Sequence, residues 1–284
     1  MILVTAATGH LGRLVVDQLL AKVSATQVVA AVRNLDKAKD LAARGVQVRK
    51  ADYEQPSTLE AAFRGATKLL LISASEIGRR VAQHENAVAA ARKAGIPLLV
   101  YTSILRADRS GISLADEHLA TERAIRGSGV PFIFLRNGWY IENYTENLGP
   151  ALQHGVIMGA ADDGRIAAAT RADYAAAAVA VLTARSEPGK VYELAGDQPF
   201  TMAELAAEVS RQSGKTVVYR NLPPDEYEKA LLGLGLPEPV ARMLRSADEG
   251  IARGDLDDRT GELRRLIGRP TTPLAQAVAA ALNR

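Results

Sequence analysis

The first twelve residues constrain the fold more than any other segment, because a strand, a tight turn and a helix start follow one another directly. Met1–Val4 is apolar, Ala6–Gly9 is a run of small residues, and apolar side chains recur at helical spacing from Leu11 onward. Such a turn lets the backbone approach a pyrophosphate, whose charge is then held by the first N–H groups and the positive end of the helix. A second apolar run, Val28–Val32, completes a βαβ unit of roughly 30 residues. We therefore expect a cofactor-binding turn rather than an ordinary strand–helix connection.

The glycine spacing of this turn is incomplete. The extended motif Gly-x-x-Gly-x-x-Gly is met by Gly9 and Gly12, whereas Ala6 occupies the first glycine position. The motif is weak by itself, and the strand before it and the helix after it support the prediction. The residues expected to bind the cofactor here are Ala6, Ala7, Thr8, Gly9, His10, Leu11 and Gly12.

The end of the second strand indicates which dinucleotide is bound. Chains that prefer NAD usually carry Asp or Glu at this tip for the ribose 2′-OH, whereas this strand ends in Arg33-Asn34. Arg33 can form a charge-assisted fork to a 2′-phosphate, so NADPH is favoured over NADH. The alternative is a solvated arginine at a strand end. We expect Asp36 to cap the helix that follows.

Strands and helices alternate along the first half of the chain, which predicts a Rossmann-type, doubly wound parallel sheet in an α/β fold. Expected strands are 46–49, 68–73, 98–103 and 132–135, and expected helices are 56–63, 82–94 and 114–126. Ligands in such sheets lie beyond the carboxyl ends of the strands. The loops that follow these strands are therefore where we expect the chemistry.

The alternation changes after Arg136, which predicts a smaller α/β substrate lobe that is discontinuous in sequence. We expect short strands at 155–159 and 165–169, an Ala-rich helix over 171–184 that returns to the main sheet, and a further core strand at 190–194. Helices at 201–212 and 224–233 and a strand at 217–221 are expected in the lobe. The predicted dinucleotide-binding part is 1–136 with 171–195, and the lobe is 137–170 with 196–284.

Composition gives no indication of a nucleic-acid or membrane partner. The 35 basic and 32 acidic residues are scattered and leave a net charge of +3. The chain has no cysteine, which excludes disulfides and thiolate chemistry, and its four histidines share no metal-ligand spacing, so no metal is predicted. The chain starts directly with an apolar strand, without a leader pattern, so the cytoplasm is the expected compartment.

Several segments together resemble the NmrA-like branch of the atypical short-chain dehydrogenases and, within it, the bacterial quinone reductases. These segments are 5–12, 32–34, 51–53, 69–75, 115–122, 135–144 and 169–174, so the likeness spans nearly the whole chain. The resemblance implies NADPH as cofactor and a planar, electron-poor acceptor as substrate. The chain departs from the family at Ala6, where glycine is usual, which predicts weaker rather than absent binding of the pyrophosphate.

The resemblance also assigns residues to the cofactor. The 6–12 turn and Arg33 would hold NADPH, Asp52 would lie near the adenine, and the loop 137–142 would cover the nicotinamide and the substrate. The further cofactor-binding residues implied are Ser73, Ala74, Ser75, Asn137, Gly138, Trp139, Tyr140, Glu142 and Thr170.

The expected chemistry depends partly on an absence. Typical short-chain dehydrogenases use Tyr with Lys four residues later as a proton donor to a ketone, and none of the eight tyrosines here has that partner. A quinone needs less help, since hydride addition gives a stabilised oxyanion and positioning can supply most of the rate. His118 occupies the slot of a lysine in related reductases and is the candidate proton donor or polarising group. The alternatives are a solvated histidine or one paired with Glu122.

Two further residues complete the expected catalytic set. Tyr140, beside the only tryptophan, Trp139, offers an aromatic face for a flat substrate, although both could instead pack in the lobe. Asn143, like Asn137, could hydrogen-bond a carboxamide or a quinone oxygen, although such residues also form turns. The competing functions are reduction of another planar compound, such as a triphenylmethane dye, and a redox sensor that binds the dinucleotide without turnover.

Overall fold

The computed structural model describes residues 1–185 and 187–283, which divide into two compact units. The first unit comprises 1–104, 117–137 and 171–192, and the second comprises 105–116, 138–170 and 193–284. The sequence placed 105–116 in the dinucleotide-binding part, whereas this segment belongs to the second unit. The later boundary falls after Tyr192 rather than after Ala195, inside a strand.

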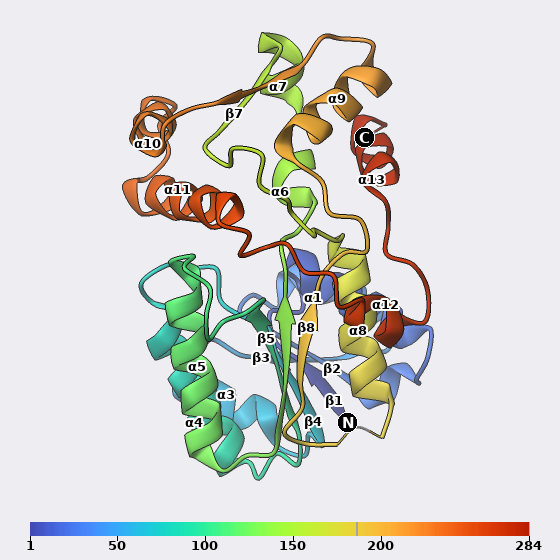
Figure 1. The fold of residues 1–284 in the computed structure, drawn as a ribbon. Helices are drawn as coiled ribbons and strands as arrows, with labels where there is room; N and C mark the ends of the chain where they lie inside the picture. The colour runs from blue at the N-terminus through green and yellow to red at the C-terminus, as the bar shows by residue number, and fades with distance from the viewer. Residues whose placement is uncertain (186, 284) are drawn as a thin grey trace. The chain divides into compact units, whose positions relative to one another are not determined.

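The first unit is built on a seven-stranded sheet of order β3-β2-β1-β4-β5-β6-β8, in which neighbours from β1 to β6 pair in parallel (Figure 1). The reversal of strand order between β1 and β4 is the switch point at which such sheets bind ligands. The strands are β1 (Ile2–Val4), β2 (Val28–Val32), β3 (Gln47–Lys50), β4 (Lys68–Leu71), β5 (Leu99–Ile104), β6 (Phe132–Asn137) and β8 (Val191–Leu194).

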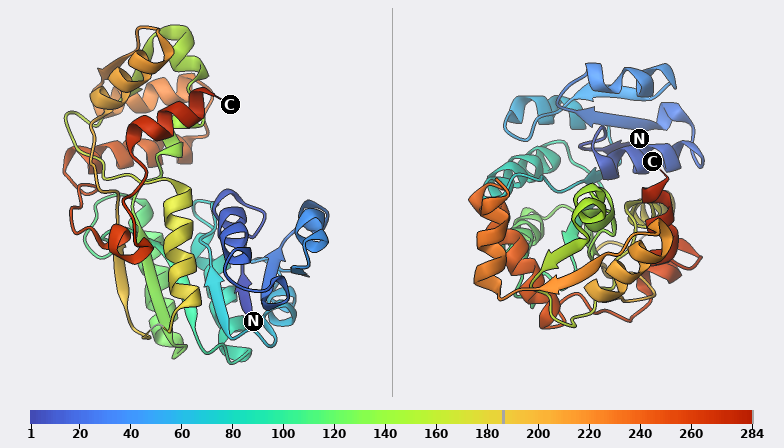
Figure 2. Two further views of the ribbon diagram at one scale, coloured as in Figure 1. Left: turned by 90° about the vertical axis from the view of Figure 1, so that its right-hand side faces the viewer. Right: turned by 90° about the horizontal axis from the view of Figure 1, so that it is seen from above.

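Helices cover both faces of this sheet. Helices α1 and α8 lie side by side on one face (Figure 2), and α3, α4 and α5 cover the other. The helices are α1 (His10–Leu20), α2 (Lys39–Ala43), α3 (Pro56–Phe63), α4 (Arg80–Lys93), α5 (Leu114–Ser128) and α8 (Arg171–Thr183), with short 3-10 turns at Ala25–Gln27 and Asp36–Ala38.

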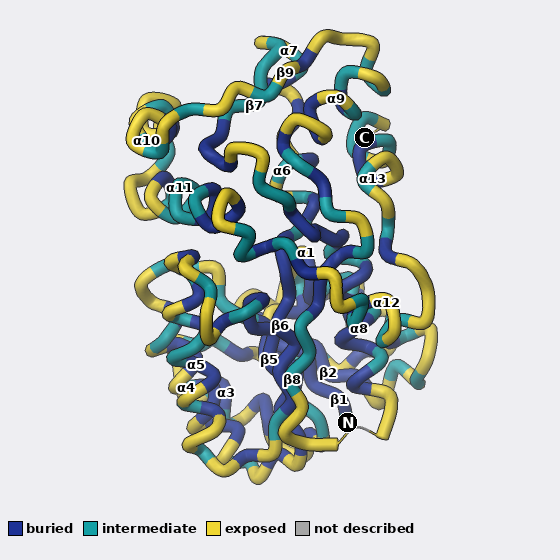
Figure 3. Tube along the Cα trace, in the orientation of Figure 1, coloured by how far each residue is buried: buried dark blue, intermediate teal, exposed yellow. Residues whose placement is uncertain are grey.

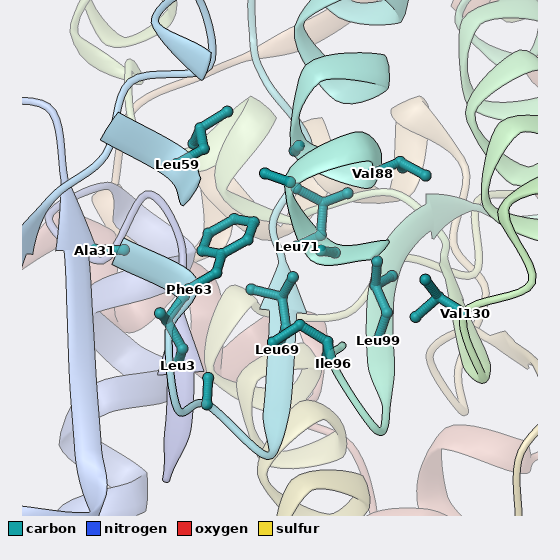
Figure 4. Close-up of a cluster of buried hydrophobic side chains, with 14 of the residues drawn as sticks. Leu3, Ala31, Leu59, Phe63, Leu69, Leu71, Val88, Ile96, Leu99 and Val130 are labelled. Atoms are coloured by element: carbon teal, nitrogen blue, oxygen red, sulfur yellow. The ribbon is translucent and has the colours of Figure 1, made fainter. Parts of the chain in front are cut away.

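The inner strands are buried along almost their whole length because helices cover both faces, which explains their continuous apolar runs (Figure 3). On the face of α3 and α4, Leu3, Leu69 and Leu99 of successive strands pack against Phe63 and Val88 (Figure 4). This packing holds the strand ends, and therefore the loops that follow them, in fixed positions.

The second unit contains a two-stranded parallel sheet of β7 (Val156–Gly159) and β9 (Val218–Asn221). Its helices are α6 (Glu142–Thr145), α7 (Gly149–His154), α9 (Met202–Ser213), α10 (Pro224–Gly233), α11 (Glu238–Ala252), α12 (Glu262–Ile267) and α13 (Leu274–Leu282). The strand expected at 165–169 is wrong: Ile166 and Ala169 form only isolated bridges, to Phe200 and Tyr140. No helix in the described part of the chain is long and apolar enough to cross a membrane.

Candidate functional site

The turn after β1 has the geometry of a phosphate cradle. Ala7 N–H donates to the Ala31 carbonyl of β2 at 3.3 Å, and Gly9 N–H closes the turn by donating to the Ala6 carbonyl at 2.9 Å. Gly9 is the N-cap of α1, and no side chain caps this helix. The start of α1 therefore presents backbone N–H groups and the positive helix end, the combination that binds anions.

Gly12 explains why the motif ends in glycine. A Cβ at this position would lie 2.3 Å from the Ala6 carbonyl oxygen, so any side chain would push α1 away from the turn. Ala6 itself has a φ of +47°, a left-handed conformation that favours glycine. This position of the turn therefore requires a positive φ, which glycine adopts freely and Ala6 adopts under strain.

Arg33 lies at the carboxyl end of β2 with 70% of its side chain exposed. Its guanidinium pairs with Glu76, which follows β4, at 3.1 Å. Because β2 and β4 flank β1, this pair spans the switch point of the sheet. The basic side chain is thus available to a phosphate, which would replace the half-buried Glu76 carboxylate as its partner.

The expected cap at Asp36 is wrong. Asp36 makes no capping hydrogen bond and pairs instead with Lys39 at 2.8 Å. Asn34 forms a local turn ahead of this segment, in which its Oδ1 accepts the Asp36 N–H at 2.8 Å. Asp52 after β3 forms a similar local turn, in which its Oδ1 accepts the Glu54 N–H at 3.0 Å.

The segment Ile72–Ser75 after β4 is held by buried hydroxyl groups. Thr5 Oγ1 accepts the Ile72 N–H at 2.9 Å, and Tyr53 donates its hydroxyl to the Ile72 carbonyl at 2.7 Å. Thr102 Oγ1 accepts the Ser73 N–H at 2.9 Å. Ser75 is exposed. The sequence pointed to Ser73, Ala74 and Ser75 but missed the side chains that fix their backbone.

His118 is neither solvated nor paired with Glu122, so both alternatives are wrong. Only 6% of the residue is exposed, and its Nδ1 lies 2.8 Å from the Tyr101 hydroxyl in β5. Burial lowers the pKa of His118 well below its usual value, so the ring is neutral at neutral pH. Glu122 binds Arg136 at 2.8 and 2.9 Å and accepts the Ser103 hydroxyl at 2.6 Å.

Asn137, the last residue of β6, carries a buried group without a partner. The residue is 4% exposed, and its Oδ1 accepts no hydrogen bond from the described part of the chain. An unsatisfied buried carbonyl is costly, and such groups are frequently completed by a ligand. Asn137 Oδ1 is therefore a buried acceptor at the carboxyl end of β6 whose hydrogen-bonding capacity is unused by the described residues.

The remaining predicted residues lie in the second unit, on two segments that pair with each other. Ala169 N–H donates to the Trp139 carbonyl at 3.1 Å, and Ile141 N–H donates to the Ala169 carbonyl at 3.0 Å. Gly138 N–H donates to the Leu194 carbonyl at 2.7 Å. Trp139 and Thr170 are buried, Tyr140 and Glu142 are half-buried, and Asn143 is exposed. No cluster of potential metal ligands occurs among the residues described.

The switch-point turn, the uncapped helix start and the loops at one sheet edge define a Rossmann-type dinucleotide-binding protein. The chain belongs to the NmrA-like family, whose model matches residues 1–264. It is 50% identical to quinone oxidoreductase 2 of Escherichia coli K12 over 283 residues, which covers 100% of this chain and 99% of that protein.

Two crystal structures are similar over almost their whole length. The NADPH complex of the E. coli NADPH-dependent quinone oxidoreductase QOR2 superposes with a TM-score of 0.97 at 50% identity, covering 100% of both chains. The NADP(H) complex of the triphenylmethane reductase of Citrobacter sp. gives a TM-score of 0.94 at 42% identity, covering 99% of this chain and 100% of that one.

Proposed function

We infer that this chain is an NADPH-dependent quinone oxidoreductase, which reduces a quinone to the hydroquinone without a flavin. The observation that carries the inference is the switch-point turn with Arg33, rather than a carboxylate, at the tip of β2. It is supported by the whole-length similarity to an E. coli protein described as an NADPH-dependent quinone oxidoreductase.

The proposed roles of the first unit's residues are supported by their positions at the carboxyl ends of the strands. The 6–12 turn would hold the pyrophosphate through backbone N–H groups, Arg33 the 2′-phosphate, and Ser73–Ser75 the ribose and nicotinamide side. Asn137 Oδ1 would accept an N–H of the carboxamide. When bound, reduced nicotinamide supplies a hydride, and the chain's task is to hold donor and acceptor in line.

Quinone reduction also needs a proton, and His118 suits only part of that task. Its neutral ring can polarise a carbonyl oxygen through an N–H but is no imidazolium acid at neutral pH. We assign the proton to solvent and keep His118 as a polarising group. The roles of Gly138, Trp139, Tyr140, Glu142, Asn143 and Thr170 stay predictions.

The test is a turnover assay with purified protein, a panel of quinones and one triphenylmethane dye, with NADPH or NADH in turn and no added flavin. The expected result is loss of reduced-nicotinamide absorbance that needs a quinone and prefers NADPH. Tight NADPH binding without turnover of any acceptor would overturn the inference and favour a sensor.

A second activity, reduction of a triphenylmethane dye, is favoured by the 42% identity to the Citrobacter reductase. Both acceptors are planar and take up hydride, so one site can serve both. The comparison of kcat/KM for the two acceptor classes decides which is the principal substrate.

A further inference from the structure

Helix α4 carries three buried polar side chains, Arg80, Gln83 and His84, on its inner side, where apolar residues are the rule. Arg80 and His84 lie in register with the buried Ala87, Val88 and Ala91 and are themselves buried. Buried polar groups are costly unless they are hydrogen-bonded, so each needs a specific partner.

Arg80 and His84 both bind the backbone of Ala74. The Ala74 N–H donates to His84 Nε2 at 2.9 Å, and Arg80 Nε donates to the Ala74 carbonyl at 2.7 Å. Arg80 is in turn held by an ion pair with Glu117, which also accepts the Gly78 N–H at 2.8 Å. The two polar backbone groups of Ala74 are thus clamped from α4.

The hydrogen-bond pattern fixes the tautomer of His84. Because the Ala74 N–H can only donate, Nε2 must be the unprotonated nitrogen, and the proton of the neutral ring lies on Nδ1. Nδ1 is 3.0 Å from Thr121 Oγ1, whose own hydroxyl donates to the Glu117 carbonyl at 2.9 Å. Burial lowers the pKa of His84 to about 3, so the accepting lone pair persists across the neutral range.

We propose that His84 is a positioning residue, which acts through the Ala74 amide to hold the 73–75 loop in the conformation that binds the dinucleotide. The proposal rests on the proposed function, because that function places the cofactor on this loop. His84 is 0% exposed, so it would act through the loop rather than by direct contact with a ligand.

Two substitutions separate the two contacts of the ring. In His84→Gln the terminal oxygen can take the place of Nε2 and accept the Ala74 N–H, whereas in His84→Asn the shorter amide can reach Thr121 but not Ala74. Ser128→Ala is the matched control, since it removes two part-buried hydrogen bonds, to Ile125 and Val130, at the C-terminal end of α5, and neither contact involves this loop.

The measurements are the NADPH dissociation constant from fluorescence titration, KM and kcat, the melting temperature, and hydrogen exchange of a peptide covering residues 72–76. We expect H84N to weaken NADPH about tenfold in Kd and KM with a smaller change in kcat, and to speed exchange of that peptide. H84Q should stay within about threefold of wild type, and S128A should lose melting temperature without losing NADPH affinity.

The proposal would be overturned if H84N left both the NADPH dissociation constant and the hydrogen exchange of the 72–76 peptide unchanged. It would also be overturned if H84N and H84Q weakened NADPH binding equally and in proportion to their loss of melting temperature. If H84N does not fold, Thr121→Val replaces it as the test. This variant keeps the imidazole ring but removes the hydroxyl that accepts the Nδ1 proton. It must also weaken NADPH binding and speed hydrogen exchange of the 72–76 peptide. Binding is read without turnover, so failure of the quinone assay leaves this test intact.

Discussion

Replacing Arg33 by alanine should convert an NADPH-preferring enzyme into one that treats the two dinucleotides alike. A charged hydrogen bond contributes about 1.5–3 kcal/mol. Arg33 is 70% exposed, however, and must first give up its ion pair with Glu76. Such a surface pair contributes less than about 1 kcal/mol. The net loss is about 1–2 kcal/mol, which corresponds to a rise of roughly 5- to 30-fold in KM for NADPH. KM for NADH, which has no 2′-phosphate, should change less than about twofold.

The assay is initial rates of quinone reduction with each dinucleotide, and Glu76→Gln provides the control. Glu76→Gln frees Arg33 from its partner and should lower KM for NADPH by up to about fivefold. If Arg33→Ala weakens NADPH and NADH equally, the side chain acts on the loop rather than on the phosphate, and the reasoning fails.

Three other predictions address the turn and a buried carboxylate. Ala6→Gly should relieve the left-handed strain at φ +47° and raise the free energy of unfolding by about 0.5–1 kcal/mol in urea titrations; a loss of stability would contradict the strain argument. Gly12→Ala should displace α1 from the turn, lowering stability by about 1–3 kcal/mol and NADPH affinity at least about tenfold in fluorescence titration; normal binding would refute the close approach. Burial raises the pKa of Asp248 to about 6 from 3.8, so the native state binds the extra proton and stability falls as the pH rises between about 4 and 6. Asp248→Asn should therefore gain about 3 kcal/mol at pH about 8 and nothing at pH about 4, measured as melting temperature; an equal gain at both would exclude ionisation as the cause.

Elements whose start and spacing are local signals were predicted closely from the sequence. Pro56 at the first position of α3 and its apolar periodicity gave the observed bounds, and the motif around Gly12 gave the switch-point turn. The segment 165–169 has an extended sequence pattern, but tertiary partners supply only single bridges, which no local rule reveals. Residues 105–116 likewise belong to the second unit because of long-range packing.

The candidate site shows the same division between local and long-range causes. Arg33 follows from its place at a strand tip, but its pairing with Glu76 joins residues far apart in the chain. His118 was a candidate proton donor with a solvated histidine as one alternative, and only the long-range contact with Tyr101 of β5 shows that it is buried and neutral. His84 was considered only as a metal ligand. A stronger signal was available, since it lies at helical spacing with Ala87, Val88 and Ala91 and, being buried with them, needs a partner.

With Arg33 in its proposed role at the 2′-phosphate, its pair with Glu76 would also affect how fast the dinucleotide is exchanged. NADPH and its oxidised product carry the same 2′-phosphate, so Glu76 competes equally with both for Arg33. Competition of this kind shortens residence time, because each departing molecule is replaced by a carboxylate already tethered nearby. On this proposal the protein would bind the cofactor less tightly and release the oxidised product faster, which would limit inhibition when the oxidised form accumulates.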